Sequence, residues 1–114
     1  RVHDIPLAFR HQYCQRVTNN RFKIKDKLRR RVCFSQLNMR DVGTAPFVDI
    51  NLIYCQNLLI YYEREQRVKI VNKLAESLVP GGVLILGPGE LPGWKHQDME
   101  KMRYENTLAY RRAD

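Results

Sequence analysis

Polar side chains able to hold a ligand follow three apolar segments of this chain. Asn38 and Met39 end the first segment, Gln56 and Asn57 end the second, and the glycine-rich stretch 87–90 follows the third. Amide groups and bare backbone bind a ligand through hydrogen bonds and supply neither a nucleophile nor a general base. We therefore expect these residues to orient a small molecule, unless the amides only tie their own loops to the backbone.

Other kinds of reactive site find no support in the sequence. It contains no GxGxxG or GxSxG pattern, so neither a dinucleotide loop nor a nucleophilic serine is predicted. Cys14, Cys33 and Cys55 form no CxxC pair and have no histidine at ligand spacing, which predicts free thiols and no metal site. Unpaired cysteines are typical of the reducing cytoplasm, where we expect the protein to reside.

The composition limits the size and class of the fold. The 114 residues carry 20 Lys and Arg against 12 Asp and Glu, a net charge of +8, and 44% of them are hydrophobic. This is enough apolar surface for one domain with a core, and it excludes a mainly disordered chain. No apolar run approaches the roughly 20 residues that a bilayer crossing needs, so no membrane insertion is expected.

The N-terminal third is predicted to be a helix followed by a hairpin. Residues 1–20 have a proline suited to a first helical turn and some apolar residues at helical positions. Apolar and charged residues then alternate, which predicts a basic β-hairpin over 21–37. Seven of the eleven residues 21–31 are Lys or Arg. Such a face is either solvated or binds an acidic partner, and a nucleic-acid-binding domain is a further alternative.

The segment 48–110 predicts a βαβ core with a terminal strand. Its predicted elements are strand 48–55, helix 63–78, strand 83–86 and a last edge strand 107–110. The first strand is almost continuously apolar, which is typical of a strand buried on both faces of a parallel sheet. Pro80, Gly81 and Gly82 are expected to stop the helix. Strand, helix and strand in this order indicate the α/β class.

The nine residues Tyr54–Tyr62, with the sequence YCQNLLIYY, resemble the C-R-N-V-L-I-Y-F segment of CheR-type chemoreceptor methyltransferases. Cys55, Asn57 and the stretch 59–61 match that segment outright. Gln56 departs from it, because the family has Arg at this position. A glutamine still forms hydrogen bonds, but it removes a fixed positive charge.

The resemblance continues on both sides of this segment, from about Phe22 to Tyr110. Residues 32–38 resemble the strand ending in Asn that precedes it in the family, and residues 87–90 resemble the family's G-x-S-E. The resemblance implies a partial Rossmann-like, S-adenosylmethionine-dependent methyltransferase fold. It would comprise the second half of the sheet, with a small antiparallel hairpin subdomain.

The resemblance also implies roles for single residues. Asn38 and Met39 would lie near the adenine of S-adenosylmethionine, and Gln56 and Asn57 would lie beside the cofactor at the next strand end. Tyr61 would point at the reacting methyl group and is our candidate catalytic residue. Taken without the family, the sequence favours a different interpretation of Tyr61, as an aromatic residue at a helix start that packs under the sheet.

The function that the resemblance implies is methylation of glutamate side chains on the cytoplasmic helices of a chemoreceptor, with a pilus-motility branch of the family as one candidate. The hairpin 21–37 would then dock the acidic receptor, or bind its tail peptide as an extra strand. A receptor-binding module that has lost methyl transfer is the main alternative.

Residues 1–114 resemble the C-terminal part of the family's catalytic domain. The glycine-rich loop and acidic residue that hold the rest of the cofactor in the family have no counterpart here. We therefore expect the isolated chain to bind S-adenosylhomocysteine weakly or not at all and to be inactive. We also expect self-association through an exposed strand edge.

Overall fold

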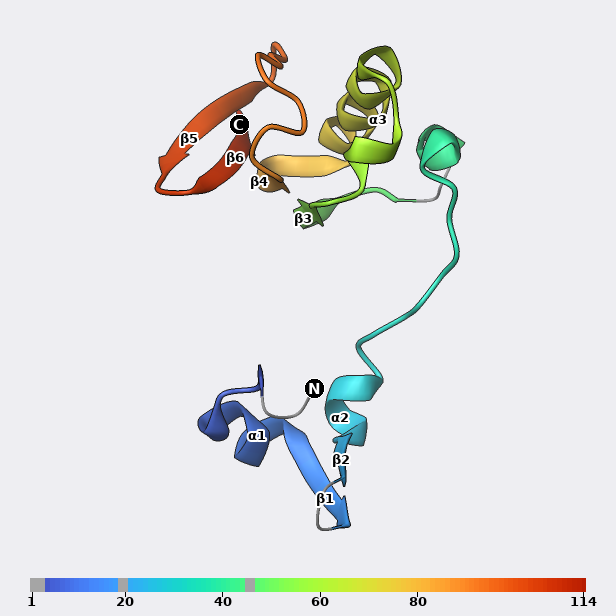
Figure 1. Ribbon diagram of the computed structural model, residues 1–114, viewed down its shortest axis with the longest axis vertical. Helices are drawn as coiled ribbons and strands as arrows, with labels where there is room; N and C mark the ends of the chain where they lie inside the picture. Colours follow the sequence, from blue (N-terminus) through green and yellow to red (C-terminus); the bar gives the residue numbers. More distant parts are fainter. Residues whose placement is uncertain (1–3, 19–20, 45–46) are drawn as a thin grey trace. The chain divides into compact units, whose positions relative to one another are not determined.

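The computed structural model describes residues 4–18, 21–44 and 47–114, and the chain divides into two compact units. The units are Arg1–Gln36 and Leu37–Asp114. Each is described by itself below (Figure 1).

The first unit is a small antiparallel sheet flanked by two short helices. Its elements are α1 (Leu7–Tyr13), β1 (Cys14–Thr18), β2 (Arg21–Ile24) and α2 (Asp26–Arg29). β1 and β2 pair antiparallel, with Cys14 opposite Ile24 and Arg16 opposite Phe22. The guanidinium of Arg16 lies 5.9 Å from the centre of the Phe22 ring, which adds a cation–π contact to this pair.

The prediction of a hairpin over 21–37 is wrong in its pairing. β2 pairs with the segment before it, and Asp26 begins a helical turn instead of a β-turn. Residues 32–38 form no strand, and Phe34 is 94% exposed. A strand is stable only where a partner and an apolar surface cover it, and the alternation over 28–37 indicates neither. The predicted helix over 1–20 is correspondingly shorter, because its second half forms β1, while residues 1–3 and 19–20 lie outside the described residues.

The second unit contains a mixed sheet in the order β3-β4-β6-β5, which confirms the α/β class. Its elements are η2 (Met39–Thr44), β3 (Ile50–Cys55), η3 (Leu59–Tyr61), α3 (Arg64–Glu76), β4 (Leu78–Leu86), β5 (Met99–Tyr104) and β6 (Thr107–Arg112). β3 and β4 are parallel and joined through α3, as the predicted βαβ unit requires. β6 pairs antiparallel with both β4 and β5.

α3 packs on one face of this sheet (Figure 1) and contributes four residues to the core, Ile70, Val71, Leu74 and Ala75. Val71 and Leu74 of the helix are buried together with Leu84 and Leu86 of β4. On β3, by contrast, Leu52 and Tyr54 are 58% and 67% exposed. The expectation that this strand is buried on both faces is therefore wrong, because β3 is an outer strand and its second face is open.

Two further boundaries differ from the sequence prediction. α3 ends before Ser77, and β4 already includes Pro80–Gly82, where its register with β3 shifts. Proline and glycine are tolerated in a strand at such an irregularity. β6 lies inside the sheet instead of at its edge, because the unpredicted strand β5 pairs outside it.

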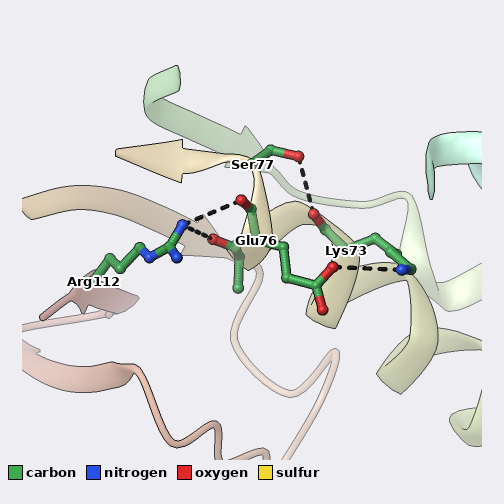
Figure 2. A network of polar contacts seen from close by, with 5 residues as sticks. Lys73, Glu76, Ser77 and Arg112 are labelled. Carbon is green, nitrogen blue, oxygen red and sulfur yellow. Dashed lines mark hydrogen bonds and ion pairs between the residues drawn. The ribbon is translucent and has the colours of Figure 1, made fainter. Parts of the chain in front are cut away.

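Arg112 of β6 fastens the end of α3 to the sheet. Its Nη1 donates to the carbonyl oxygen of Glu76 at 3.1 Å (Figure 2). The same Nη1 also donates to the carbonyl oxygen of Leu78. The last carbonyl groups of a helix lack partners within the helix, and a cation there also complements the helix dipole. The arginine therefore stabilises the junction between α3 and β4, whose C-terminal end carries part of the candidate site.

Candidate functional site

The carboxyl end of β3 is joined to the end of β4 by the side chain of Gln56. Its Oε1 accepts a hydrogen bond from the Tyr54 hydroxyl, and its Nε2 donates to the carbonyl oxygen of Leu86 at 3.4 Å. Both polar ends of this amide are thus used within the protein. The structure favours the alternative in which Gln56 ties its own loop to the backbone.

Asn57 follows with a left-handed backbone, at a φ of 60°. Asparagine adopts this conformation more readily than most residues, because its short side chain tolerates it. The backbone N–H of Asn57 donates to Oε1 of Glu90, in the loop after β4. The residue itself is exposed, so its side chain is presented at the strand end.

Tyr61 ends the short helix η3 and is 77% exposed. The preceding Leu59 is fully buried and anchors this helix in the core. The alternative that Tyr61 packs under the sheet is therefore excluded. Its hydroxyl is open to a ligand from the same short segment that carries Asn57.

Arg67 of α3 connects this segment to the loop after β4 through hydrogen bonds. Its Nε donates to the carbonyl oxygen of Tyr62 at 2.6 Å and its Nη2 to that of Ile60 at 3.4 Å. Its Nη1 donates to the carbonyl oxygen of Glu90 at 2.8 Å. Sequence reasoning missed Arg67, because a basic residue on a helix carries no signal of this kind. Glu90 was visible only as the last residue of the Gly87–Glu90 motif.

Asn38 and Met39 are held by other neighbours. Oδ1 of Asn38 accepts from the backbone N–H of Arg40 at 3.0 Å, so this amide too is tied to its own loop. Met39 begins η2, packs against the core and lines a groove of about 380 Å³ beside Ile70 of α3. Their predicted place beside the adenine stays a prediction.

The buried carboxylate of Glu90 lies close to the carboxyl end of β3, where it contacts Asn57. Glu90 is 4% exposed, and its charge is the second cause, after burial, that raises the pKa of Cys55 to about 11. The Cys55 thiol is therefore protonated at neutral pH and is a poor nucleophile. Within residues 57–62, Asn57 and Tyr61 are the exposed residues with polar side chains.

Comparison with known proteins identifies the family. A family model described as CheR methyltransferase, SAM binding domain, matches residues 1–108. The chain belongs to the CheR methyltransferase family. S-adenosylmethionine is the cofactor that the description of this CheR domain names, in agreement with the sequence prediction. Within the described part of the chain, no helix is long and apolar enough to cross a membrane.

Curated relatives of this CheR domain include chemotaxis protein methyltransferases. Those of Vibrio anguillarum and Vibrio parahaemolyticus are 39% and 37% identical to it over 93 residues, which is 82% of this chain and 34% of each relative. A probable biofilm formation methyltransferase of Pseudomonas aeruginosa is 28% identical over 111 residues, 94% of this chain and 25% of that protein. The chain thus spans about a third of the length of the chemotaxis relatives.

The groups at the strand end of the CheR domain suit this cofactor. The side chains of Asn57 and Tyr61 are neutral hydrogen-bonding groups, and the carboxylate of Glu90 accepts a hydrogen bond from the backbone N–H of Asn57. A sulfonium cation is attracted by a negative charge, and Gln56 introduces no fixed cation at this position. Asn57 and Tyr61 are thus exposed hydrogen-bonding residues in the segment that follows β3.

Proposed function

We propose that this CheR domain contributes to the transfer of a methyl group from S-adenosylmethionine to glutamate side chains of a chemoreceptor. The observation that carries the proposal is the exposure of both Asn57 and Tyr61 in the short segment that follows β3, a strand of a parallel pair. Ligands of open α/β sheets bind beyond this end of the strands. We place the reaction in the cytoplasm, on the cytoplasmic helices of the receptor.

The chemistry explains why neutral residues suffice. S-adenosylmethionine supplies an electrophilic methyl group, and a glutamate carboxylate is already ionised at pH 7. No general base is needed, so the residues of the domain have to align the carboxylate and exclude water. The Tyr61 hydroxyl and the Asn57 amide are suited to this orientation by hydrogen bonding. The product is a methyl ester.

The basic face of the first unit is our candidate for receptor docking. All seven Lys and Arg residues within 21–31 are exposed, and Arg29 forms an exposed ion pair with Asp26 at 3.5 Å. The remaining cations attract an acidic helix and speed its encounter with the enzyme. A receptor tail peptide would add as a strand to the sheet of β1 and β2, which replaces the hairpin predicted over 21–37.

A chimaera tests the catalytic proposal. In it, this chain replaces the aligned third of the Vibrio parahaemolyticus chemotaxis protein methyltransferase, and methyl incorporation into receptor is measured. Tyr61→Phe should lower kcat about tenfold, which corresponds to the loss of one orienting hydrogen bond. Tyr104→Phe is the matched control, because Tyr104 is also an exposed tyrosine but lies on β5. Equal activity of the two variants would contradict the role of Tyr61.

One observation favours a second candidate function, a receptor-binding module without methyl transfer. Gln56 stands where the family has Arg, and its amide is engaged by Tyr54 and Leu86. This candidate predicts no methyl incorporation by the chimaera, with or without Gln56→Arg, while receptor binding persists. Restored activity in Gln56→Arg alone would show that the glutamine is what disables transfer.

A further inference from the structure

Glu90 is a buried carboxylate whose placement depends on the loop after β4. It is 4% exposed, and its Oε1 accepts the backbone N–H of Asn57. Its own N–H donates to the carbonyl oxygen of Gly87 at 3.1 Å, which closes a tight turn. A Cβ atom at Gly87 would lie only 2.8 Å from the Glu90 carboxylate. The glycine thus leaves the space in which the carboxylate reaches the end of β3.

The pairing of Glu90 is incomplete, which argues against a role in stability alone. Its Oε2 is buried and has no hydrogen-bond partner among the described residues. Burying a carboxylate is costly unless its oxygens are paired, and a functional role is one of the explanations for such an exception. The raised pKa of the Cys55 thiol has the Glu90 charge as one of its causes, which places that charge next to the strand end.

Arg67 completes the connection between the two loops. One guanidinium donates to the carbonyl oxygens of Ile60 and Tyr62, on either side of Tyr61, and also to that of Glu90. The planar fork of arginine can hold three acceptors at fixed angles, which the single ammonium of lysine cannot reproduce. The helix η3 is therefore linked through Arg67 to the same loop that holds Asn57.

We propose that Glu90 and Arg67 are positioning residues that fix the segment 57–62, so that Asn57 and Tyr61 are presented together at the carboxyl end of β3. Neither residue needs to touch a ligand for this role. The effect of this positioning on catalysis rests on the function proposed above, whereas the effect on the conformation of 57–62 does not. It can be measured on the chain alone, without cofactor.

Amide hydrogen exchange of the isotope-labelled chain, followed by NMR, tests the proposal. Glu90→Ala should speed exchange of the Asn57 amide about tenfold, the effect of losing one hydrogen bond to a charged group. Glu90→Gln should restore part of the protection, because the amide oxygen still accepts. Arg67→Lys should shift and speed the amides of Tyr61 and Tyr62. The matched controls are Glu105→Gln and Arg64→Lys, at exposed positions on the β5–β6 turn and on α3.

The pattern of the changes decides the outcome. Effects confined to 57–62, with partial rescue by Glu90→Gln, support the positioning role. Unchanged amides in this segment would overturn it, and so would a uniform loss of protection across α3 and β4, which would indicate a general structural role. If the chimaera transfers no methyl group while the local effects hold, the proposed function fails and the positioning role stands.

Discussion

The guanidinium of Arg112 donates a hydrogen bond of 3.1 Å to the carbonyl oxygen of Glu76. This contact joins β6 to the end of α3, although Arg112 and Glu76 are 36 residues apart in sequence. Within the same turn, Lys73 pairs with Glu76 at 3.4 Å and Ser77 donates to the Lys73 carbonyl oxygen at 3.0 Å (Figure 2). The end of the helix is thus held from the sheet and from within its own last turn.

Arg112→Lys is expected to destabilise the second unit by about 1–2 kcal/mol, because the lysine keeps the charge but loses the fork that holds several carbonyl oxygens. Urea unfolding followed by Trp94 fluorescence measures this, since Trp94 is the single tryptophan and is buried in this unit. Arg111→Lys is the control, because Arg111 forms an ion pair at the surface with Asp114, at 3.1 Å, and its replacement should cost little. Equal losses in both variants would contradict the capping role.

Gly87→Ala should destabilise the second unit by about 1–3 kcal/mol, because the new methyl group displaces the buried Glu90 carboxylate. Adding Glu90→Ala should recover part of this loss, since it removes the group that the methyl meets. Gly89→Ala is the matched control: its cost comes from a φ of 80°, and a Cβ there meets nothing within 4 Å. Glu90→Ala should therefore not rescue it, and additive effects of Gly87→Ala and Glu90→Ala would refute the contact.

The pKa of Cys55 predicts a loss of stability at alkaline pH. Burial, followed by the Glu90 charge, raises this pKa from 9.0 to about 11, so the folded chain keeps the thiol proton more tightly than the unfolded chain does. The contribution, about 3 kcal/mol at most, is complete below about pH 9 and is lost as the pH rises towards 11. Burial also raises the pKa of Tyr110, so the titration of this residue likewise lowers the stability of the fold as the pH rises.

Comparison with Cys55→Ala isolates the thiol from Tyr110. The free energy of unfolding of the variant should fall less steeply between about pH 9 and 11 than that of the parent chain. Cys33→Ala, at an exposed position, should follow the parent curve. Parallel curves for all three proteins would show that Cys55 does not titrate in this range.

Charge reversal tests the docking face. Lys23→Glu with Lys25→Glu should weaken binding to an acidic receptor helix by about tenfold or more at low salt, and the difference should shrink as salt rises. Lys95→Glu with Lys101→Glu makes the same change in net charge, from +8 to +4, on the second unit. Isothermal titration of the receptor helix into both double variants measures the two losses of affinity. A larger loss for Lys23→Glu with Lys25→Glu supports a localised docking face, whereas equal losses would indicate attraction by net charge alone.

The local sequence predicted the parts of the fold that depend on short-range pattern. The apolar repeat of α3 and the apolar runs of β3 and β4 indicated a βαβ unit, and the parallel pair confirms it. The prediction of a hairpin over 21–37 was wrong because alternation identifies a strand but not its partner. In the structure, β2 pairs with the preceding strand β1. The strand β5 was missed because its residues Met99–Tyr104 are mostly polar or charged, as an outer strand permits.

The sequence by itself determined the family and the segment Tyr54–Tyr62, because identity over a motif needs no coordinates. Only the tertiary structure decided how these residues are used. The side-chain amides of Gln56 and Asn38 form hydrogen bonds with backbone groups, and Asn57 and Tyr61 are exposed. Glu90 and Arg67 meet the segment from a loop and a helix that follow it in sequence. Such contacts depend on the distances that folding creates between segments, and no residue type or spacing along the chain encodes them directly.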